Sequence, residues 1–258
     1  MNDILSVTLI QPDIIWQNIP ENLSKYQAII DNIEQSSDII FFPEMFATGF
    51  LRDPNIINDR EYELVLEWML KSARKLKSCI AGSHPVKSKG RFYNRFIVAF
   101  PDGSIQHYDK RHLFALGGEN LHFQPGNKRM VFEWKGWKIM PLICYDLRFP
   151  VWSRNTLDYD LLVYSANWPK ARNKVWETLL MARAIENQCF VAGVNRVGTD
   201  GQSIEYEGRS MIISPKGEIM DQLGNSEDLL TVSLNKEELI KFRKEFPVLN
   251  DTDRFTLY

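Results

Sequence analysis

Short apolar runs alternate with amphipathic segments along the first half of this chain. Ile4–Ile10, Asp38–Phe42 and Cys79–Ser83 are short, largely apolar runs bounded by polar or turn residues, a pattern that predicts buried strands. Pro20–Gln35 and Glu61–Lys77 carry apolar residues at helical spacing, which predicts two helices. Strands that alternate with helices in this way are typical of the α/β class.

Turn signals organise the rest of the chain. Pro101-Asp102-Gly103-Ser104 and Lys135-Gly136 each separate two strand-like runs and predict two hairpins. The predicted hairpin strands are Phe92–Phe100, Ile105–Tyr108, Val131–Trp134 and Lys138–Cys144. The predicted later elements are strand Leu161–Ser165, helix Asn173–Asn187, strands Phe190–Val197, Arg209–Ser214 and Leu229–Leu234, and a helix from about Lys236 to Lys244. Together these patterns predict two sheets with helices on their outer faces.

A reactive side chain follows or closes three of the predicted strands. These side chains are the carboxylate of Glu44, the ammonium of Lys110 and the thiol of Cys144. The carboxyl ends of strands are where α/β proteins build their sites. A thiol nucleophile, a carboxylate that moves protons and a cation that holds negative charge are a complete set for acyl transfer. Taken alone, Cys144 would be interpreted as a core thiol, Glu44 as a loop carboxylate and Lys110 as a surface lysine. Together the three residues predict a hydrolytic site.

The motifs around these residues resemble those of the nitrilase superfamily of carbon–nitrogen hydrolases, whose triad is Glu–Lys–Cys in that chain order. They are FPEMFATGF at Glu44, YDKRHLF at Lys110 and LICYDLRFP at Cys144. The resemblance covers nearly the whole chain. It implies a single carbon–nitrogen hydrolase domain over residues 1–258, folded as a four-layer αββα sandwich. It also implies a homodimer or higher homo-oligomer.

Three further segments, CYDLRFPVWSRN, YSANWP and ARAIENQCFVAGVNRVG, look like the bacterial omega-amidase branch. The resemblance thus implies an enzyme that hydrolyses the terminal amide of 2-oxoglutaramate or 2-oxosuccinamate and needs no cofactor. True nitrilases typically carry a Trp-Glu pair where this chain has Tyr145-Asp146, which favours an amide substrate over a nitrile. Another aliphatic amidase or an N-carbamoyl amine amidohydrolase stays open, since only the pocket would differ. The intact set of three residues argues against a non-catalytic interaction module. A Cys–His protease is disfavoured because none of the histidines lies in a protease signature.

The resemblance assigns a role to each residue. Cys144 would attack the amide carbonyl as a thiolate, its pKa lowered by Lys110, by nearby backbone N–H groups and by its place at the mouth of a helix. Lys110 and the N–H of Tyr145 would hold the oxyanion. Glu44 would take the thiol proton, protonate the departing ammonia and later activate water. Glu119 matches the second glutamate of the family and would orient Lys110 or complete the proton network.

Substrate-binding residues are expected near Cys144. A 2-oxo acid amide carries a carboxylate, which suits a guanidinium because the paired hydrogen bonds match in geometry. Arg172 is the favoured partner of this carboxylate, whereas Arg148 is expected to pair with a nearby acid as a structural residue. Four aromatic residues are candidates for pocket walls, with Trp168 the best placed; they are Phe46, Phe114, Tyr145 and Trp168.

Other polar and sulfur-containing residues have structural interpretations. Asn167 and Asn195 end strands and are expected to orient the site by hydrogen bonds. Glu186 is expected to form a buried ion pair with Arg183. Cys79 and Cys189 have apolar neighbours and are expected to be packing residues.

Composition narrows the possible functions. The chain has 258 residues, 44% of them hydrophobic and 25% charged, which is ordinary for a globular domain. A net charge of −2 with interleaved acidic and basic residues predicts no nucleic-acid partner. No apolar run approaches the ~18–20 residues of a membrane helix, and the first residues do not resemble a signal peptide. Three scattered cysteines suit a reducing cytoplasm, and four histidines without ligand-like spacing predict no metal site.

Overall fold

The computed structural model describes residues 3–33 and 35–256, which form two six-stranded sheets and a short two-stranded ribbon. The first sheet has the order β14-β1-β2-β3-β4-β5, and the second has the order β13-β12-β9-β8-β7-β6. The first-sheet strands are β1 (Ile4–Gln11), β2 (Ile39–Phe41), β3 (Cys79–Ser88), β4 (Arg91–Ala99), β5 (Ile105–Asp109) and β14 (Asp228–Asn235). The second-sheet strands are β6 (Phe132–Trp134), β7 (Trp137–Ile143), β8 (Leu161–Ser165), β9 (Phe190–Val194), β12 (Met211–Ile213) and β13 (Ile219–Gln222). The ribbon pairs β10 (Val197–Thr199) with β11 (Glu205–Glu207).

The central strands of each sheet are parallel, and the outer strands are antiparallel. β1, β2 and β3 run in one direction, with Val7 beside Ile39 and Ile39 beside Cys79. β7, β8 and β9 also run parallel, with Ile143 beside Ser165. The loops that follow the parallel strands therefore leave each sheet at one edge.

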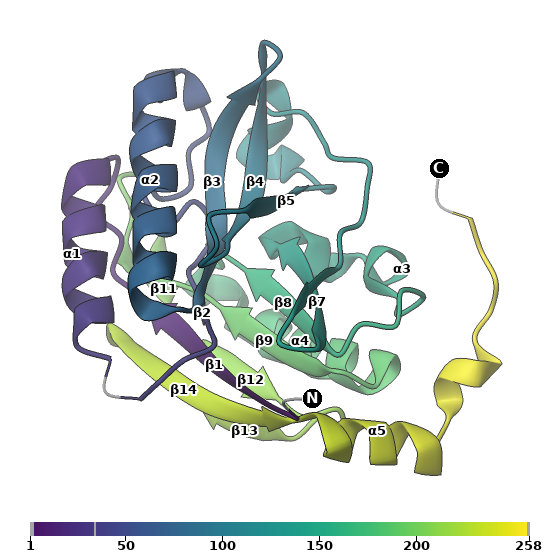
Figure 1. Cartoon of the computed structure of the whole chain (residues 1–258). Helices are drawn as coiled ribbons and strands as arrows, with labels where there is room; N and C mark the ends of the chain where they lie inside the picture. The colour runs from purple at the N-terminus through teal and green to yellow at the C-terminus, as the bar shows by residue number, and fades with distance from the viewer. Residues whose placement is uncertain (1–2, 34, 257–258) are drawn as a thin grey trace.

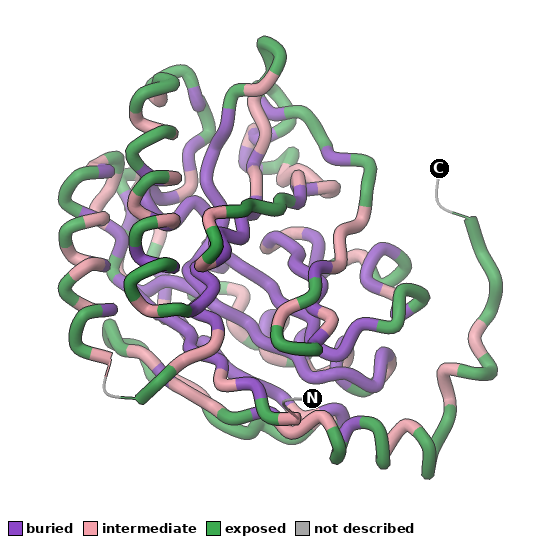
Figure 2. Tube along the Cα trace, in the orientation of Figure 1, coloured by how far each residue is buried: buried purple, intermediate pink, exposed green. Residues whose placement is uncertain are grey.

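The two sheets pack face to face around the main core, and helices cover their outer faces (Figure 1). Apolar side chains of both sheets meet in this core, including Val7 and Phe41 from the first and Leu142 from the second. A second cluster packs α1 (Ile19–Asp31) and α2 (Asp59–Leu76) on the first sheet. The buried strands and the more exposed outer sides of these helices are visible in Figure 2. The predicted αββα sandwich is confirmed.

Helix α4 (Asn173–Asn187) packs directly on β9 because the strand has a glycine where the helix crosses it. A Cβ atom at Gly193 would lie 2.5 Å from Leu180 Cδ1 and 2.7 Å from Trp176 Cζ2. Any larger residue would push the helix off the sheet. Two further α-helices are α3 (Pro150–Ser153) and α5 (Lys236–Glu245).

Most predicted elements are confirmed to within a few residues, and the differences have local causes. Helix α2 begins earlier than predicted, because Asn58 and Glu61 form a capping box with bonds of 3.0 and 2.8 Å. The predicted strand Phe190–Val197 divides, since Val197 leaves the sheet to bridge Asp13 and pair with β11. Helix α1 ends at Asp31, and part of its predicted extension, Glu34, lies outside the described residues.

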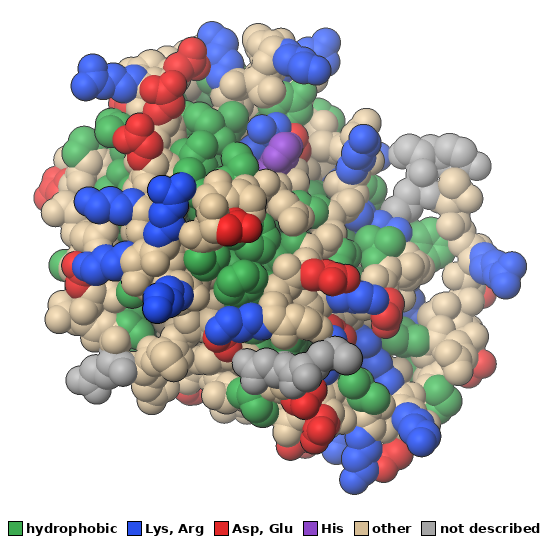
Figure 3. All heavy atoms as spheres, viewed as in Figure 1, with side chains coloured by type: hydrophobic (Ala, Val, Ile, Leu, Met, Phe, Trp, Pro, Cys, Tyr) green, Lys and Arg blue, Asp and Glu red, His purple; other side chains and the backbone are tan. Residues whose placement is uncertain are grey.

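No helix in the part of the chain that the structure describes is long and apolar enough to cross a membrane. Within residues 3–33 and 35–256, no group of three or more His, Cys, Asp or Glu side chains is arranged to hold a metal ion. Acidic and basic side chains are interspersed on the face drawn in Figure 3.

Candidate active site

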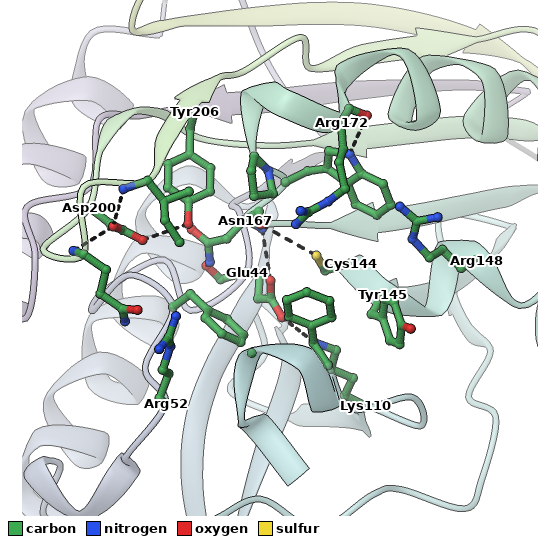
Figure 4. Close-up of a pocket in the computed structure, with 17 residues that line it drawn as sticks. Glu44, Arg52, Lys110, Cys144, Tyr145, Arg148, Asn167, Arg172, Asp200 and Tyr206 are labelled. Atoms are coloured by element: carbon green, nitrogen blue, oxygen red, sulfur yellow. Dashed lines mark hydrogen bonds and ion pairs between the residues drawn. The ribbon is translucent and has the colours of Figure 1, made fainter. Parts of the chain in front are cut away.

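Glu44, Lys110 and Cys144 meet in one pocket at the edge where the strand-end loops gather (Figure 4). Glu44 follows β2, Lys110 follows β5 and Cys144 follows β7, so both sheets contribute. The pocket has an empty volume of about 590 Å³.

Lys110 is buried between two carboxylates. Its Nζ atom donates to Glu44 Oε1 at 2.7 Å and to Glu119 Oε2 and Oε1 at 2.9 and 3.1 Å. All three side chains are fully buried. The structure thus brings Glu44, which is 66 residues away in the sequence, to the Lys110–Glu119 pair.

The charges of this cluster set its protonation. Burial lowers the pKa of Lys110, but the charges of Glu119 and Glu44 outweigh burial and raise this pKa above its usual value. Burial raises the pKa of Glu119, against the opposing effect of Lys110. The lysine therefore stays a cation, while the cluster carries more acidic than basic groups.

Cys144 sits at a sharp turn between β7 and a 3-10 turn, Cys144–Arg148. Its backbone φ of 42° lies in the left-handed region, which is uncommon for a residue with a side chain. Asp146 stabilises this turn, because its Oδ2 atom accepts the N–H of Ile143 at 3.0 Å. The Cys144 Sγ atom lies 3.8 Å from the carbonyl oxygen of Asn167, and the residue as a whole is half-buried.

The expected lowering of the Cys144 pKa was wrong. Burial raises this pKa well above its usual value, and the negative charge of Glu44 raises it further, with Lys110 acting in the opposite direction. Lys110 does not lower the pKa of Cys144 enough to offset these effects, because its charge is already shared between two carboxylates. The turn after Cys144 is also too short to supply the dipole of a full helix. The resting group is therefore a neutral thiol.

Two asparagines link the strand-end loops, as the sequence predicts. Asn167 donates its backbone N–H to Glu44 Oε2 at 3.0 Å and its side-chain amide to the Glu44 carbonyl oxygen at 2.6 Å. Asn195 Oδ1 accepts the backbone N–H of Trp168 at 2.8 Å, and its Nδ2 donates to the Trp168 carbonyl at 3.0 Å. These bonds connect the loop after β8 to the loops after β2 and β9.

Two predicted arginines border the pocket on the side of Cys144 (Figure 4). Arg172 lies over the ring of Phe114 at 5.6 Å, and Arg148 lies over the ring of Trp168 at 5.2 Å. The expected ion pair of Arg148 with an acid was wrong; in the described part of the chain its contact is the Trp168 ring, and no carboxylate pairs with it. Tyr145 lines the same wall and meets Phe114 edge-on.

The expectation that Phe46 is a pocket wall was wrong. Its side chain is fully buried on the outer face of the first sheet, where it packs against Tyr26, Phe42 and Trp68. The turn at Met45, with a φ of 45°, directs Glu44 and Phe46 to different sides of the loop. Phe46 therefore stabilises the loop from behind.

The expected packing role of two cysteines is confirmed, and the expected buried Arg183–Glu186 ion pair is confirmed in part. Cys79 and Cys189 are buried in the main core. Arg183 donates to Glu186 at 2.9 Å, although the Glu186 side chain remains 33% exposed and the pair is therefore only partly buried.

The opposite wall of the pocket was missed by the sequence interpretation. It includes Phe50 and Arg52 after β2, and residues of the β10–β11 ribbon. In the ribbon, Asp200 accepts the hydroxyl of Tyr206 at 2.9 Å and two backbone N–H groups, of Gln202 and Ile204. Their position in the sequence could have indicated this wall, because both segments follow central strands and therefore lie at the same edge of the sheets.

Comparison with known proteins places this arrangement in a family. The profile of the Carbon-nitrogen hydrolase family matches residues 6–244. The chain is 42% identical to Omega-amidase YafV of Escherichia coli (strain K12), covering 98% of this chain and 99% of that protein. It is 35% identical to 2-oxoglutaramate amidase of Bacillus subtilis (strain 168), covering 95% and 96% of the two chains.

The fold of this chain also matches a solved structure over nearly the full length of both chains. XC1258 from Xanthomonas campestris, described as a CN-hydrolase superfamily protein with an arsenic adduct in the active site, is 38% identical. It superposes with a TM-score of 0.92, covering 99% of each chain. The match in sequence, fold and extent leads to one conclusion: this chain belongs to the carbon–nitrogen hydrolase family.

Proposed function

We propose that this protein is an omega-amidase. It would hydrolyse the terminal amide of a 2-oxo dicarboxylic acid monoamide, such as 2-oxoglutaramate or 2-oxosuccinamate, to the 2-oxo dicarboxylate and ammonia. The observation that carries the proposal is one pocket, which holds Cys144, the buried Lys110–Glu44 pair and two arginines. Neither arginine is paired with a carboxylate of residues 3–33 or 35–256. The relatives named omega-amidase and 2-oxoglutaramate amidase support the choice of substrate.

The first half of the reaction forms a thioester. Glu44 takes the proton of Cys144 as Sγ attacks the amide carbonyl carbon. The carbonyl electron pair moves to oxygen, which the Lys110 ammonium and the Tyr145 N–H stabilise. The intermediate then collapses, the C–N bond breaks, and Glu44 returns the proton to nitrogen so that ammonia leaves.

The second half returns the enzyme to its starting state. Glu44 takes a proton from water as the water oxygen attacks the thioester carbonyl carbon. The C–S bond then breaks, the acid product leaves, and Sγ recovers the proton. The raised pKa of Cys144, which burial causes, supports this scheme because a neutral thiol needs a base to become a nucleophile.

The far end of the substrate would be held by a guanidinium. Arg172 lines the pocket and has no carboxylate partner in the described chain, so its charge is available to the substrate carboxylate. Trp168 fixes the segment of Arg172, since its Nε1 atom donates to the Arg172 carbonyl at 2.9 Å. Phe114, Tyr145 and Trp168 would form the apolar walls beside the substrate chain, and Arg148 would add a second cation.

Three wider assignments belong to the same proposal. Residues 1–258 would form a single carbon–nitrogen hydrolase domain, which the family match over 6–244 supports. The enzyme would act in the cytoplasm, where three unpaired cysteines stay reduced. It would work as a homodimer or higher homo-oligomer, with exposed apolar side chains such as Ile185 and Phe246 available to a second copy. Light scattering of the purified protein measures this last assignment.

Ammonia release tests the function. The substrates are 2-oxoglutaramate, glutamine, an N-carbamoyl amine and a simple nitrile, each with the wild type and with Cys144→Ala. Release from the 2-oxo amide that Cys144→Ala abolishes supports an omega-amidase. Release from another substrate alone would keep the nucleophile and overturn the substrate.

A further inference from the structure

Asn94, in the middle of β4, connects the two buried glutamates of the site. Its Nδ2 atom donates one hydrogen bond to Glu44 Oε1 at 2.8 Å and a second to Glu119 Oε1 at 3.0 Å. The side chain is fully buried and does not line the pocket. Both hydrogens of its amide are therefore used on the two carboxylates that also bind Lys110.

Ser83, on the neighbouring strand β3, fixes which way the amide of Asn94 faces. Ser83 Oγ accepts the backbone N–H of Met45 at 2.8 Å, so its own hydrogen is free to be donated. It lies 2.9 Å from Asn94 Oδ1 and donates to that atom. Because Oδ1 is held by this hydroxyl, Nδ2 has to face the carboxylates. A chain of hydrogen bonds thus runs from the turn that carries Glu44 back to Glu44 itself.

We propose that Asn94 is a positioning residue that selects the working oxygen of Glu44, with Ser83 orienting its amide. This inference rests on the proposed function and extends it to the residues behind the pocket. Glu44 Oε1 accepts two hydrogen bonds, from Lys110 and Asn94, and so has no free lone pair in the carboxylate plane. Among the described residues, the one group that donates a hydrogen bond to Glu44 Oε2 is the backbone N–H of Asn167, at 3.0 Å. Oε2 is the oxygen left to take the thiol proton.

Asn94 also separates the two carboxylates without adding a charge. Lys110 supplies one positive charge for two buried carboxylates, and Asn94 adds a neutral donor that hydrogen-bonds to both of them. Burial raises the pKa of Glu119, and the hydrogen bond from Asn94 opposes that rise, as Lys110 does. Loss of this donor would let Glu119 take a proton at a higher pH.

The variants Asn94→Ala and Ser83→Ala test the inference, with Asn155→Ala as the matched control. Asn155 is also a buried amide with several hydrogen bonds, but its partners are Tyr159 and Asn187, away from the site. For Asn94→Ala we expect kcat to fall about 10²-fold, because the base is no longer held in place, with KM little changed. The acid limb of the kcat–pH profile should move up by about one pH unit. Ser83→Ala should also lower kcat and move the acid limb up, but by smaller amounts than Asn94→Ala.

The control separates positioning from simple loss of stability. Asn155→Ala should lower the melting temperature while keeping the kcat and the pH profile of the wild type. If Asn94→Ala does not fold, Ser83→Ala decides the question, because it retains the amide. A folded variant, of either residue, with wild-type kcat and an unshifted acid limb overturns the proposal. So does an Asn155→Ala variant with the same fall in kcat and the same shift.

A second measurement does not depend on the substrate. If the wild type releases no ammonia from any of the amides, the proposed function fails, but alkylation of Cys144 by iodoacetamide still reports on Glu44 as its base. We expect Asn94→Ala to slow this alkylation at pH 7 by about tenfold, part of the contribution of a general base. An unchanged alkylation rate in folded Asn94→Ala overturns the inference independently.

Discussion

Lys110 Nζ lies 2.7 Å from Glu44 Oε1, with both side chains completely buried. The pair is only part of a larger cluster, because Glu119 Oε2 lies 2.9 Å from the same nitrogen. One cation therefore balances two carboxylates next to Cys144. This excess of negative charge adds to burial in keeping the cysteine a thiol. In the proposed reaction, Lys110 would still provide the cation for the oxyanion.

Removal of the buried cation should destabilise the fold. Lys110→Met leaves two buried carboxylates without their partner, and we expect it to lower the free energy of unfolding by about 3–5 kcal/mol. Urea unfolding measures this change. Lys138→Met is the control, since the Lys138–Asp158 pair is largely exposed and its loss should change stability little. Equal stability of both variants would contradict a buried, structurally required ammonium.

The resting enzyme should contain no thiolate at Cys144 near neutral pH. The raised pKa of Cys144, caused first by burial and then by the charge of Glu44, predicts deprotonation only in alkaline solution. The absorbance of thiolate at 240 nm, taken as the difference between wild type and Cys144→Ala, should show no step between pH 5 and pH 8. A step in that range would mean that Lys110 outweighs burial.

The two arginines near Cys144 should contribute differently to substrate binding. Arg172→Met should raise KM for 2-oxoglutaramate about 10–100-fold, as expected for the loss of hydrogen bonds to a charged group. Arg148→Met should raise KM less, because the Arg148 guanidinium lies over the Trp168 ring. Arg172→Lys should restore part of the binding, since the charge remains but the paired geometry is lost. A larger effect of Arg148→Met would assign the substrate carboxylate to Arg148.

His84 should make the fold sensitive to acid. It is fully buried beside Tyr62, neither ring nitrogen has a hydrogen-bond partner in the described chain, and burial lowers its pKa from 6.5 to about 3. Above pH 6.5 the ring is neutral in both folded and unfolded states. Between pH 6.5 and 3 only the unfolded state takes the proton, so stability falls as the pH falls.

Urea unfolding at pH 7.5 and pH 4.5 tests this effect. We expect the wild type to lose about 2–3 kcal/mol through this group over that interval, whereas His84→Leu should not show this contribution. His122→Gln serves as the control because His122 is exposed, and it should keep the acid sensitivity. If His84→Leu loses as much stability as the wild type, His84 is not the source.

The positions of Glu44, Lys110 and Cys144 could be predicted because each follows a recognisable strand. Apolar runs place strands, and parallel strands bring their following loops to one edge. The same logic extends to Arg172 and Trp168, which follow β8. Strand ends are therefore the part of the site that a hydrophobic pattern reveals.

The remaining features of the site depend on three-dimensional geometry that the hydrophobic pattern of the sequence does not predict. Phe46 is separated from Glu44 by the left-handed turn at Met45, so its side chain packs behind the sheet instead of lining the pocket. The pKa of Cys144 depends on how many carboxylates share Lys110, which the sequence does not reveal. Asn94 lies inside a strand, where its polar side chain gives no sign of the two carboxylates that it meets.

The most direct test of the account is whether Cys144 becomes acylated by the 2-oxo amide. Rapid acid quench of the wild type with 2-oxoglutaramate, followed by mass spectrometry of the digested protein, measures this. We predict the mass of the acyl group on the peptide that contains Cys144, none on the peptides of Cys79 or Cys189, and neither adduct nor turnover in Cys144→Ala. Ammonia release by Cys144→Ala at the wild-type rate would contradict the central claim that this thiol carries the reaction.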